Sequence, residues 1–423
     1  MVINYIIYKP KITKGHYLFS IIFFIGYGFI QESLFDYLNL VEYNQKSFPL
    51  WLTALYLVFI CYYGDVFNYL KDKSLLFLSG LGAIGGLITY IGGIAITPIE
   101  SLTPFYYFAV AIGWAIFFPL SIRVFYEGYF WNKILDASLY YSFDLSGYLR
   151  HKKFFNEKIY FNKGLKGIIT GGTSGLGLAA SLKMADQGVE VIITGRSELR
   201  GSSAEKKNDL LKFFPLDMSD WNKITTFVDL IDPQDFIVLN AGGMPNKFTK
   251  NTNGVELQFA SQLCGHYYLI REMNLKGKLK DGAKIVWVTS GGMYLSNLNL
   301  NIIFDNPKYD KVATYANVKR AQVTLLTYFK ESFPNQIVTA MHPGWAATPG
   351  VSSSIPEFNK KMEGKLRSPL QAADTILWLL STKNKIVSGE LYFDRKRVRK
   401  NFFWFTKPNK KKIEELKRIL NSW

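Results

Sequence analysis

The chain has 423 residues, enough for two or three domains with a sizeable core. Hydrophobic residues make up 48% of it, and 50 Lys and Arg against 33 Asp and Glu give a net charge of +17 at pH 7. A lipid surface or a phosphorylated cofactor suits this charge, whereas nucleic acid is not expected because no nucleic-acid-binding motif accompanies it. The two cysteines and four histidines are too scattered for a disulfide framework or a metal site.

Residues 1–130 contain four apolar runs, at 16–31, 48–64, 75–97 and 103–122. Each run approaches the ~20 residues that a helix needs to cross the hydrocarbon core of a bilayer. We therefore predict a multi-span transmembrane domain of about four helices, with an uncleaved first span. Because the first two runs are short, a soluble all-helical domain remains the alternative. Gly82 and Gly86 in the third run have the GxxxG spacing that lets two membrane helices pack closely.

The charges around the apolar runs predict an orientation. Basic residues lie before the first run, between the second and third runs, and after the fourth run: Lys9, Lys11, Lys14, Lys71, Lys73, Arg123 and Lys133. The two remaining loops are mainly acidic, with Glu32, Asp36, Glu42 and Glu100 beside Lys46. Under the positive-inside rule, the N-terminus and the C-terminal domain both face the cytoplasm. We expect almost nothing ionisable inside the runs, which favours an anchor or a lipid-facing vestibule over an ion path.

Residues 131–163, which we call the connector, mix aromatic and basic residues at irregular helical spacing. This pattern is typical of an amphipathic segment at a membrane interface. A plain linker helix packed on the following domain is the alternative.

Residues 164–400 change to short β-branched or aromatic runs that alternate with helical segments. This alternation predicts an α/β fold, a Rossmann-type doubly wound parallel sheet of about seven strands. The expected strands are 166–170, 189–193, 213–215, 236–239, 285–288, 337–340 and 391–393.

A phosphate site is expected directly after the first of these strands, in "IITGGTSGLG". Gly171, Gly175 and Gly177 permit a tight turn and a close backbone approach. The N-terminus of the next helix offers unpaired N–H groups and a positive dipole to a pyrophosphate. The second strand ends in Gly195 and Arg196. It therefore lacks the acidic side chain that would bind the ribose 2′-hydroxyl of NAD(H) at this position. This favours a 2′-phosphate and hence NADP(H), with a merely solvated Arg196 as the alternative.

Two further motifs carry acid-base chemistry. Ser290 ends the fifth strand in "VTSGG", and "TYANVK" places Tyr315 and Lys319 one helical turn apart. A phenol of pKa ~10 is a poor acid-base catalyst at neutral pH unless a nearby cation favours its anion. Lys319 is expected to be that cation.

Together these motifs resemble the short-chain dehydrogenase/reductase family, whose TGxxxGxG turn is similar to "TGGTSGLG" and whose strand-four motif is similar to "NAG" at 240–242. The resemblance implies that Tyr315 exchanges a proton with the carbonyl or alcohol oxygen, that Ser290 hydrogen-bonds this oxygen, and that Lys319 also holds the nicotinamide ribose. "PLDMSD" resembles the family's adenine contact, and "HPGWAATPGV" the segment that reaches the carboxamide. The implied cofactor-binding residues are Gly171, Thr173, Ser174, Gly175, Leu176, Gly177, Arg196, Asp217, Met218, Asn240, Ala241, Gly242, Tyr315, Lys319, Pro343, Gly344 and Thr348.

Five more motifs, "GGMPNK", "VTSGGM", "MHPGWAATPGV", "AADTILWL" and "SGELYFDRK", are similar to the branch of this family typified by dehydrogenase/reductase SDR family member 12. The likeness runs from about residue 165 to 397. One departure is Gln262, at the position of a helical Asn that helps to order a water behind the catalytic Lys in the family. Gln keeps the amide but adds a methylene, so the proton relay is expected to be slowed or rerouted.

Residues 401–423 read as a basic, partly amphipathic C-terminal helix. Such a helix either lies on anionic lipid or stays solvated.

The sequence thus predicts a membrane-anchored, NADP-dependent short-chain dehydrogenase/reductase that acts on a lipophilic carbonyl or secondary alcohol, in lipid metabolism. The alternative is a catalytically weak dinucleotide-binding sensor or scaffold, supported by Gln262. A third reading makes the front domain a small transporter or a docking site for a membrane partner. The sequence leaves the oligomeric state open, a homo-oligomer included.

Overall fold

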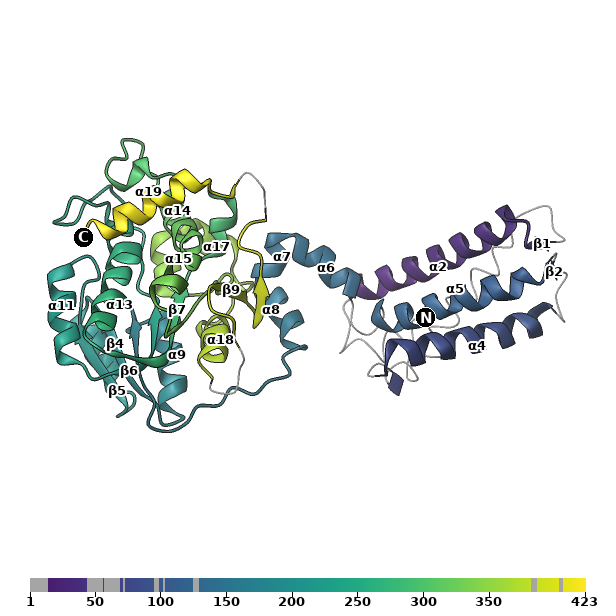
Figure 1. Ribbon diagram of the computed structural model, residues 1–423, viewed down its shortest axis with the longest axis horizontal. Coiled ribbons are helices and arrows are strands. Elements are labelled where there is room, and N and C mark those ends of the chain that lie inside the picture. The colour runs from purple at the N-terminus through teal and green to yellow at the C-terminus, as the bar shows by residue number, and fades with distance from the viewer. Residues whose placement is uncertain are drawn as a thin grey trace. The chain divides into compact units, whose positions relative to one another are not determined.

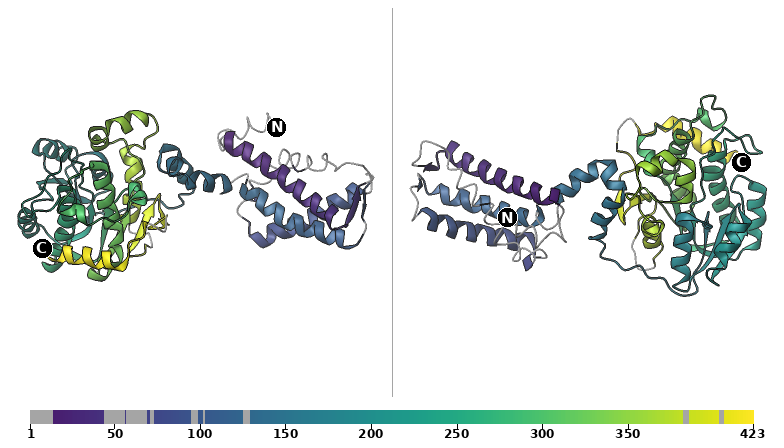
Figure 2. Two further views of the ribbon diagram at one scale, coloured as in Figure 1. Left: turned by 90° about the horizontal axis from the view of Figure 1, so that it is seen from above. Right: turned by 180° about the vertical axis from the view of Figure 1, so that it is seen from behind.

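The computed structural model describes residues 14–43, 56, 69–70, 73–94, 99–101, 103–124, 129–381, 386–402 and 406–423. The chain divides into two units, Met1–Ser138 and Leu139–Trp423. Each unit has its own hydrophobic core. The ribbons of the two units are drawn in Figures 1 and 2, and each unit is described separately below.

Among its described residues, the first unit contains three helices that are long and apolar enough to cross a membrane: α2 (Lys14–Tyr37), α4 (Leu75–Ile94) and α5 (Phe105–Ile122). They correspond to the first, third and fourth predicted runs. The second run, 48–64, lies outside the described residues except for Tyr56. The short strands β1 (Val41–Tyr43) and β2 (Ile99–Ser101) pair antiparallel, and α6 (Tyr129–Ala137) follows α5.

Close packing of α4 on α5 confirms the use predicted for the small residues. A side chain at Gly82 would meet the main chain of Trp114, and one at Gly86 would meet the Trp114 ring. Only glycine therefore allows the two helices to approach as they do, because nothing larger than hydrogen fits at these contacts.

Helix α2 extends beyond the first apolar run and adds an ionisable residue, Glu32, that was placed in the following loop. Helix α2 does not end near residue 31 but continues to Tyr37, because nothing in the following residues breaks a helix. Glu32 is fully buried there and accepts hydrogen bonds from the hydroxyls of Tyr56 and Tyr90. Glu32 and Asp36 are thus helix residues rather than loop residues.

The second unit is built on an eight-stranded sheet in the order β10-β9-β8-β7-β6-β3-β4-β5, parallel except for β10. The strands are β3 (Lys166–Thr170), β4 (Glu190–Gly195), β5 (Leu211–Pro215), β6 (Gln234–Leu239), β7 (Leu279–Val288), β8 (Ile337–Met341), β9 (Glu390–Phe393) and β10 (Lys396–Val398). All seven predicted strands are present. The eighth, β10, was not predicted and forms an antiparallel hairpin with β9.

Helices cover both faces of this sheet, as the doubly wound prediction requires (Figure 1). One core contains side chains of α9 (Gly175–Ala185), α10 (Glu198–Glu205) and α18 (Pro369–Leu380). The other contains side chains of α11 (Trp221–Leu230), α13 (His266–Leu275), α14 (Lys311–Thr324) and α15 (Leu326–Ser332).

The C-terminal helix α19 (Lys410–Asn421) packs its apolar side on the domain and leaves its charged side exposed to solvent. Leu416 and Leu420 are buried in the core beside α15, and the Tyr328 hydroxyl donates to Asn421 Oδ1 at 2.9 Å. The apolar side of α19 is therefore covered by the domain, so it is not free to lie on lipid.

Part of the connector also belongs to the second unit. Helices α7 (Leu139–Phe143) and α8 (Leu145–Lys152) pack on it, and Phe143 is a core residue with 3% exposure. From Leu139 onward the structure therefore favours the alternative of a linker packed on the following domain.

Candidate active site

The glycine-rich turn lies between β3 and α9, at the carboxyl end of the sheet. Gly171 and Gly175 have φ of +67° and +56°, a backbone region that favours glycine. A side chain at Gly177 would come within 2.5 Å of the Gly171 carbonyl oxygen, so the third glycine allows α9 to start close to the turn. Ser174 is at the N-cap position without a side-chain cap hydrogen bond. The first N–H groups of α9 can therefore bind an anion.

Asn240 fixes this turn from the neighbouring strand β6. Its side-chain amide donates to the carbonyl oxygens of Thr170 at 2.9 Å and Gly171 at 3.2 Å. The main-chain N–H groups of Asn240 and Ala241 both donate to Thr170 Oγ1 at 2.9 Å. The "NAG" motif thus shapes the turn through hydrogen bonds before any ligand is bound.

His266, which the sequence analysis did not select, completes that arrangement. Burial lowers its pKa to about 3, so the ring is neutral. Its Nδ1 faces the Gln262 carbonyl oxygen at 3.0 Å, which can only accept, so Nδ1 carries the proton. Nε2 then accepts from Thr170 Oγ1 at 2.9 Å. The Thr170 hydroxyl thereby keeps its lone pairs for the two N–H groups at the end of β6.

Ser290, Tyr315 and Lys319 lie together beyond the end of β7. Asp310 caps α14 and so fixes the start of the helix that carries Tyr315 and Lys319. The Tyr315 hydroxyl is hydrogen-bonded to the Ser290 side chain. Lys319 Nζ donates to the Val288 carbonyl oxygen at 2.9 Å and lies 5.2 Å from the centre of the Tyr315 ring. The three predicted catalytic side chains therefore form one cluster.

The electrostatics of this cluster differ from the expectation in one respect. Burial raises the pKa of Tyr315 to about 12, and only the hydrogen bond with Ser290 opposes it. Burial also lowers the pKa of Lys319 to about 7. Lys319 thus does not hold the phenol as its anion, because the amine is itself desolvated and bound to a carbonyl oxygen. Tyr315 carries its proton at neutral pH and is prepared to donate it.

Gln262 is fully buried in the π-helical turn η2 (Ala260–Gly265) between α12 (Leu257–Phe259) and α13. Its amide Nε2 donates to the Gly243 carbonyl oxygen at 2.8 Å, and its main-chain oxygen accepts from Gln322 Nε2 at 2.7 Å. Its Oε1 has no partner among the described residues. The added methylene thus brings the amide to the "NAG" loop, and an ordered water behind Lys319 remains a prediction.

The other predicted cofactor residues lie around the same end of the sheet. Arg196 is exposed at the end of β4, and Thr173 packs on Gly195. Met218 is buried, while Asp217 Oδ1 accepts from Ser219 and so shapes its own loop. Of the remaining members, Leu176 lies in the first turn of α9, Gly242 follows β6, and Pro343, Gly344 and Thr348 lie in the segment after β8.

Thr348 connects the segment after β8 with the glycine-rich turn. Its side chain lies 3.3 Å from the position that a Gly175 side chain would take, and its Oγ1 accepts from Val351 N to begin α16 (Pro349–Ser354). One region at this end of the sheet is thus lined by three features. They are the narrow glycine-rich turn, the open N–H groups at the start of α9, and the Gln262 Oε1 atom, which has no partner among the described residues. These residues fit a dinucleotide.

Comparisons with known proteins show which family the chain belongs to. A family model described as short chain dehydrogenase matches residues 167–298. The human protein named dehydrogenase/reductase SDR family member 12 is 32% identical over 243 residues, which cover 55% of this chain and 77% of that protein. The chain belongs to the short-chain dehydrogenase/reductase family. Polyprenol dehydrogenase of Danio rerio, also similar, is 27% identical over 266 residues, covering 58% of this chain and 82% of that protein.

The fold of this short-chain dehydrogenase/reductase also matches a solved structure. A crystal structure of an uncharacterised protein from Mycobacterium paratuberculosis superimposes with a TM-score of 0.51 at 20% identity, covering 63% of this chain and 96% of that one. The resemblance to the member 12 branch is confirmed. Residues 2–120 match a different family model, DUF2878, described as a protein of unknown function. The short-chain dehydrogenase/reductase domain thus follows a region of another family.

Proposed function

We propose that the protein is a membrane-anchored, NADP(H)-dependent oxidoreductase that acts on a carbonyl or secondary alcohol of a lipophilic substrate. The observation that carries this proposal is the protonated Tyr315, hydrogen-bonded to Ser290 beside Lys319, at the sheet end that bears the glycine-rich turn. Such a cluster supports proton donation to an oxygen that receives electrons from a neighbouring hydride donor.

The residues then have distinct roles in reduction. The Tyr315 hydroxyl donates its proton to the substrate oxygen, and the Ser290 hydroxyl hydrogen-bonds the same oxygen. Lys319, protonated below a pKa of about 7, stabilises the phenolate that the proton transfer leaves behind. The glycine-rich turn, Asn240 and Thr348 would hold the dinucleotide, which supplies the hydride when bound. Oxidation of an alcohol uses the same contacts in reverse.

A lipophilic substrate is favoured by two observations. The described part of the chain carries three helices long and apolar enough to cross a membrane, which would keep the enzyme where such a substrate partitions. One relative is named for polyprenol, a long-chain lipid alcohol. The direct test compares lipid extracts of cells with and without the gene by mass spectrometry. A lipid pair that differs by two hydrogens should shift, and unchanged extracts would count against a lipid substrate.

A cofactor-binding sensor is the second candidate, and the altered amide at Gln262 favours it. The two candidates differ in turnover. A panel of hydrophobic ketones and aldehydes, followed by NADPH absorbance in nanodiscs, should give turnover if the protein is an oxidoreductase. Tight NADPH binding without turnover across the panel would support the sensor.

Cofactor choice depends on Arg196 in this proposal. Arg196 is exposed, and the preceding Gly195 offers no carboxylate to a ribose 2′-hydroxyl. NADPH should therefore bind more tightly than NADH, and Arg196→Asp should reverse the order. The measurement is a fluorescence titration of both cofactors against both proteins. Lys207→Asp makes the same charge change at the far end of α10 and should leave the order unchanged. A wild-type preference for NADH would refute the assignment.

Orientation in the membrane is also part of the proposal. Basic residues flank the ends of the apolar runs that are assigned to the cytoplasmic side, whereas Glu42 and Glu100 lie on β1 and β2. Tags at both termini should therefore be protected from protease in sealed cells, and a tag near Gln45 should be cut. Cleavage of either terminal tag without lysis would contradict a cytoplasmic catalytic domain.

A further inference from the structure

A pair of short helices follows Thr348 and packs only loosely on the rest of the domain. Helices α16 and α17 (Pro356–Lys361) contain no buried residue, although they directly follow a segment assigned to the cofactor. We call Pro349–Lys361 the flap. A segment without buried side chains gains little stability from packing, so its position depends on what holds its two ends.

Both ends of the flap are held by the connector. Before the flap, the Trp345 N–H donates to the Phe143 carbonyl oxygen at 2.8 Å. After the flap, the Leu145 N–H donates to the Lys365 carbonyl oxygen, also at 2.8 Å. The two flanks are also tied to each other, because the Arg367 N–H donates to the Trp345 carbonyl oxygen at 2.8 Å. Two connector residues, Phe143 and Leu145, thus hold the two flanks of the flap.

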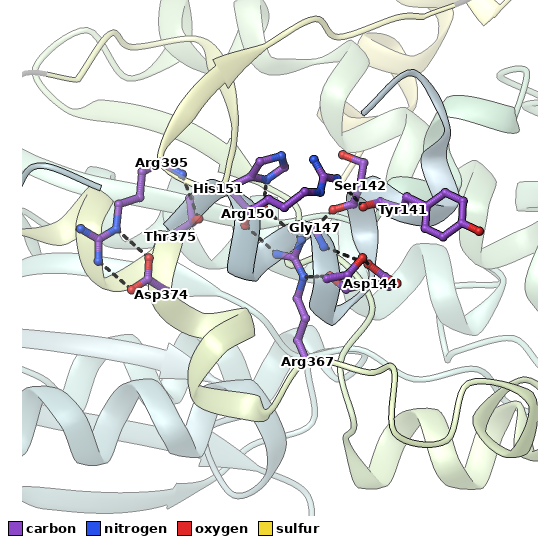
Figure 3. A network of polar contacts seen from close by, with 12 residues as sticks. Tyr141, Ser142, Asp144, Gly147, Arg150, His151, Arg367, Asp374, Thr375 and Arg395 are labelled. Atoms are coloured by element: carbon purple, nitrogen blue, oxygen red, sulfur yellow. Dashed lines mark hydrogen bonds and ion pairs between the residues drawn. The ribbon is translucent and has the colours of Figure 1, made fainter. Parts of the chain in front are cut away.

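Arg367 strengthens this base from inside the domain (Figure 3). Its buried guanidinium donates to the connector carbonyl oxygens of Ser142 at 2.9 Å and Asp144 at 3.2 Å, and to the Pro343 carbonyl oxygen at 3.3 Å. Asp394 balances its charge at 2.6 Å. One side chain therefore joins the connector to the Pro-Gly segment that precedes the flap.

Aromatic contacts connect the same elements. The Phe143 ring lies 4.7 Å from that of His342 and would collide with any side chain at Gly291, the residue after Ser290. The Tyr140 ring lies 5.5 Å from that of Trp345, which in turn lies 5.4 Å from that of Phe358 in the flap. The connector therefore contacts the neighbours of a catalytic residue and, through one ring, the flap itself.

We propose that connector residues Tyr140–Leu145 are the fixed support of the flap, with Tyr140, Phe143 and Arg367 as positioning residues for cofactor and substrate. The proposal rests on the proposed function, since it assigns the flap to the cofactor and substrate side of that site. The catalytic unit then begins at the connector, well before the first strand of its sheet.

The decisive variant is Tyr140→Ala in the full chain in detergent. Tyr140 is half-buried, so its loss should leave the midpoint of thermal unfolding nearly unchanged while the ring contact to Trp345 disappears. We expect trypsin to cut the flap after Lys360 and Lys361 about three- to tenfold faster, as loss of one aromatic pair predicts. The dissociation constant of NADPH and the substrate KM should rise by a similar factor, with kcat retained.

Two further variants separate positioning from general packing. Tyr140→Phe keeps the ring and should restore wild-type cleavage and KM. Leu149→Ala changes an exposed connector side chain and should match wild type throughout. Arg367→Met is less informative because it removes the buried guanidinium from Asp394, leaving His151 as the partner of that carboxylate, and is expected to unfold the domain.

The outcomes distinguish this proposal from the function on which it rests. If Tyr140→Ala shows wild-type flap cleavage and wild-type NADPH affinity, the support role is wrong. If wild type itself binds no NADPH, the proposed function fails, while the cleavage comparison still decides whether the connector holds the flap.

Discussion

Tyr315→Phe is expected to lower turnover by about 10²- to 10⁴-fold, the usual contribution of a general acid-base group. The phenol is the proton donor of the site, and burial holds its pKa near 12, so the proton is present throughout the neutral range. Phenylalanine keeps the ring beneath Lys319 and removes only the hydroxyl. The fold and NADPH affinity should therefore change little.

The measurement is NADPH oxidation with a hydrophobic ketone or aldehyde in nanodiscs, beside a cofactor titration. Tyr328→Phe is the control, because it removes a hydroxyl from α15 that bonds to Asn421 rather than to the active site. Turnover of Tyr315→Phe at the wild-type rate would show that the assigned mechanism is incorrect.

The pH dependence of the two directions follows from the same protonated phenol. Reduction consumes the proton that Tyr315 already carries and also needs the Lys319 ammonium, whose pKa is about 7, so its rate should fall as pH rises through about 7. Oxidation needs the phenolate, so its rate should rise with pH toward the Tyr315 pKa. A reduction rate that stays constant through pH 7 would show that the phenolate does not need the Lys319 ammonium.

The main sheet could be predicted from sequence because its strands are buried runs separated by helices. Strand β3 has the predicted bounds, 166–170, and the carboxyl ends of β3, β6 and β7 bring the glycine-rich turn, Asn240 and Ser290 to one edge. Strand β10 was missed because its hairpin turns through Asp394 and Arg395, both at positive φ. Neither is glycine, so the usual signal of such a turn is absent.

The predictions that failed concern segments whose apolar side can be covered either by lipid or by protein. The aromatic and basic pattern of the connector suits a lipid interface as well as a protein surface, and only the burial of Phe143 shows which applies beyond Leu139. The same holds for Leu416 and Leu420 of α19. In the sequence, Glu32 has the pattern of a loop carboxylate, and only the structure shows that the hydroxyls of Tyr56 and Tyr90 donate hydrogen bonds to it.

His266 and Arg367 were missed for a different reason. Both side chains form hydrogen bonds largely with main-chain groups, and such contacts leave no pattern in the sequence. The only local signal for His266 is its position one helical turn after Gln262, on the same face of the helix. Arg367 acts across more than two hundred residues of chain, and no spacing rule predicts such a contact.

Lys319→Met is expected to abolish most turnover and yet stabilise the folded domain below neutral pH. Turnover should fall at least about 10²-fold, since the phenolate loses its cation, and NADPH affinity should fall with it. Burial lowers the Lys319 pKa from its ordinary 10.5 to about 7, so the folded state disfavours the ammonium. Methionine fills similar space without a charge, and a free-energy cost on the order of a few kcal/mol is removed.

The sign of the stability difference between Lys319→Met and wild type should depend on pH. Below pH 7 the lysine is charged in both states, and the wild-type protein carries the full cost of burying that charge. Between about 7 and 10.5 the unfolded chain holds a proton that the folded chain does not, so wild-type stability rises with pH. Above that range the cost is gone, and the variant lacks the Nζ bond to Val288, which leaves a buried carbonyl oxygen unpaired. The advantage of Lys319→Met should therefore shrink with pH and then reverse.

Lys284→Met provides the matched control for this pH dependence. Burial lowers the Lys284 pKa to about 8, and its Nζ donates to the carbonyl oxygens of Leu380 and Ser381, away from the catalytic cluster. It should show the same direction of pH dependence in thermal unfolding while keeping wild-type turnover. A Lys319→Met protein whose advantage over wild type does not shrink from pH 7 to 10 would contradict a desolvated amine. The Lys319 pKa in the folded protein would then lie near or above its ordinary 10.5.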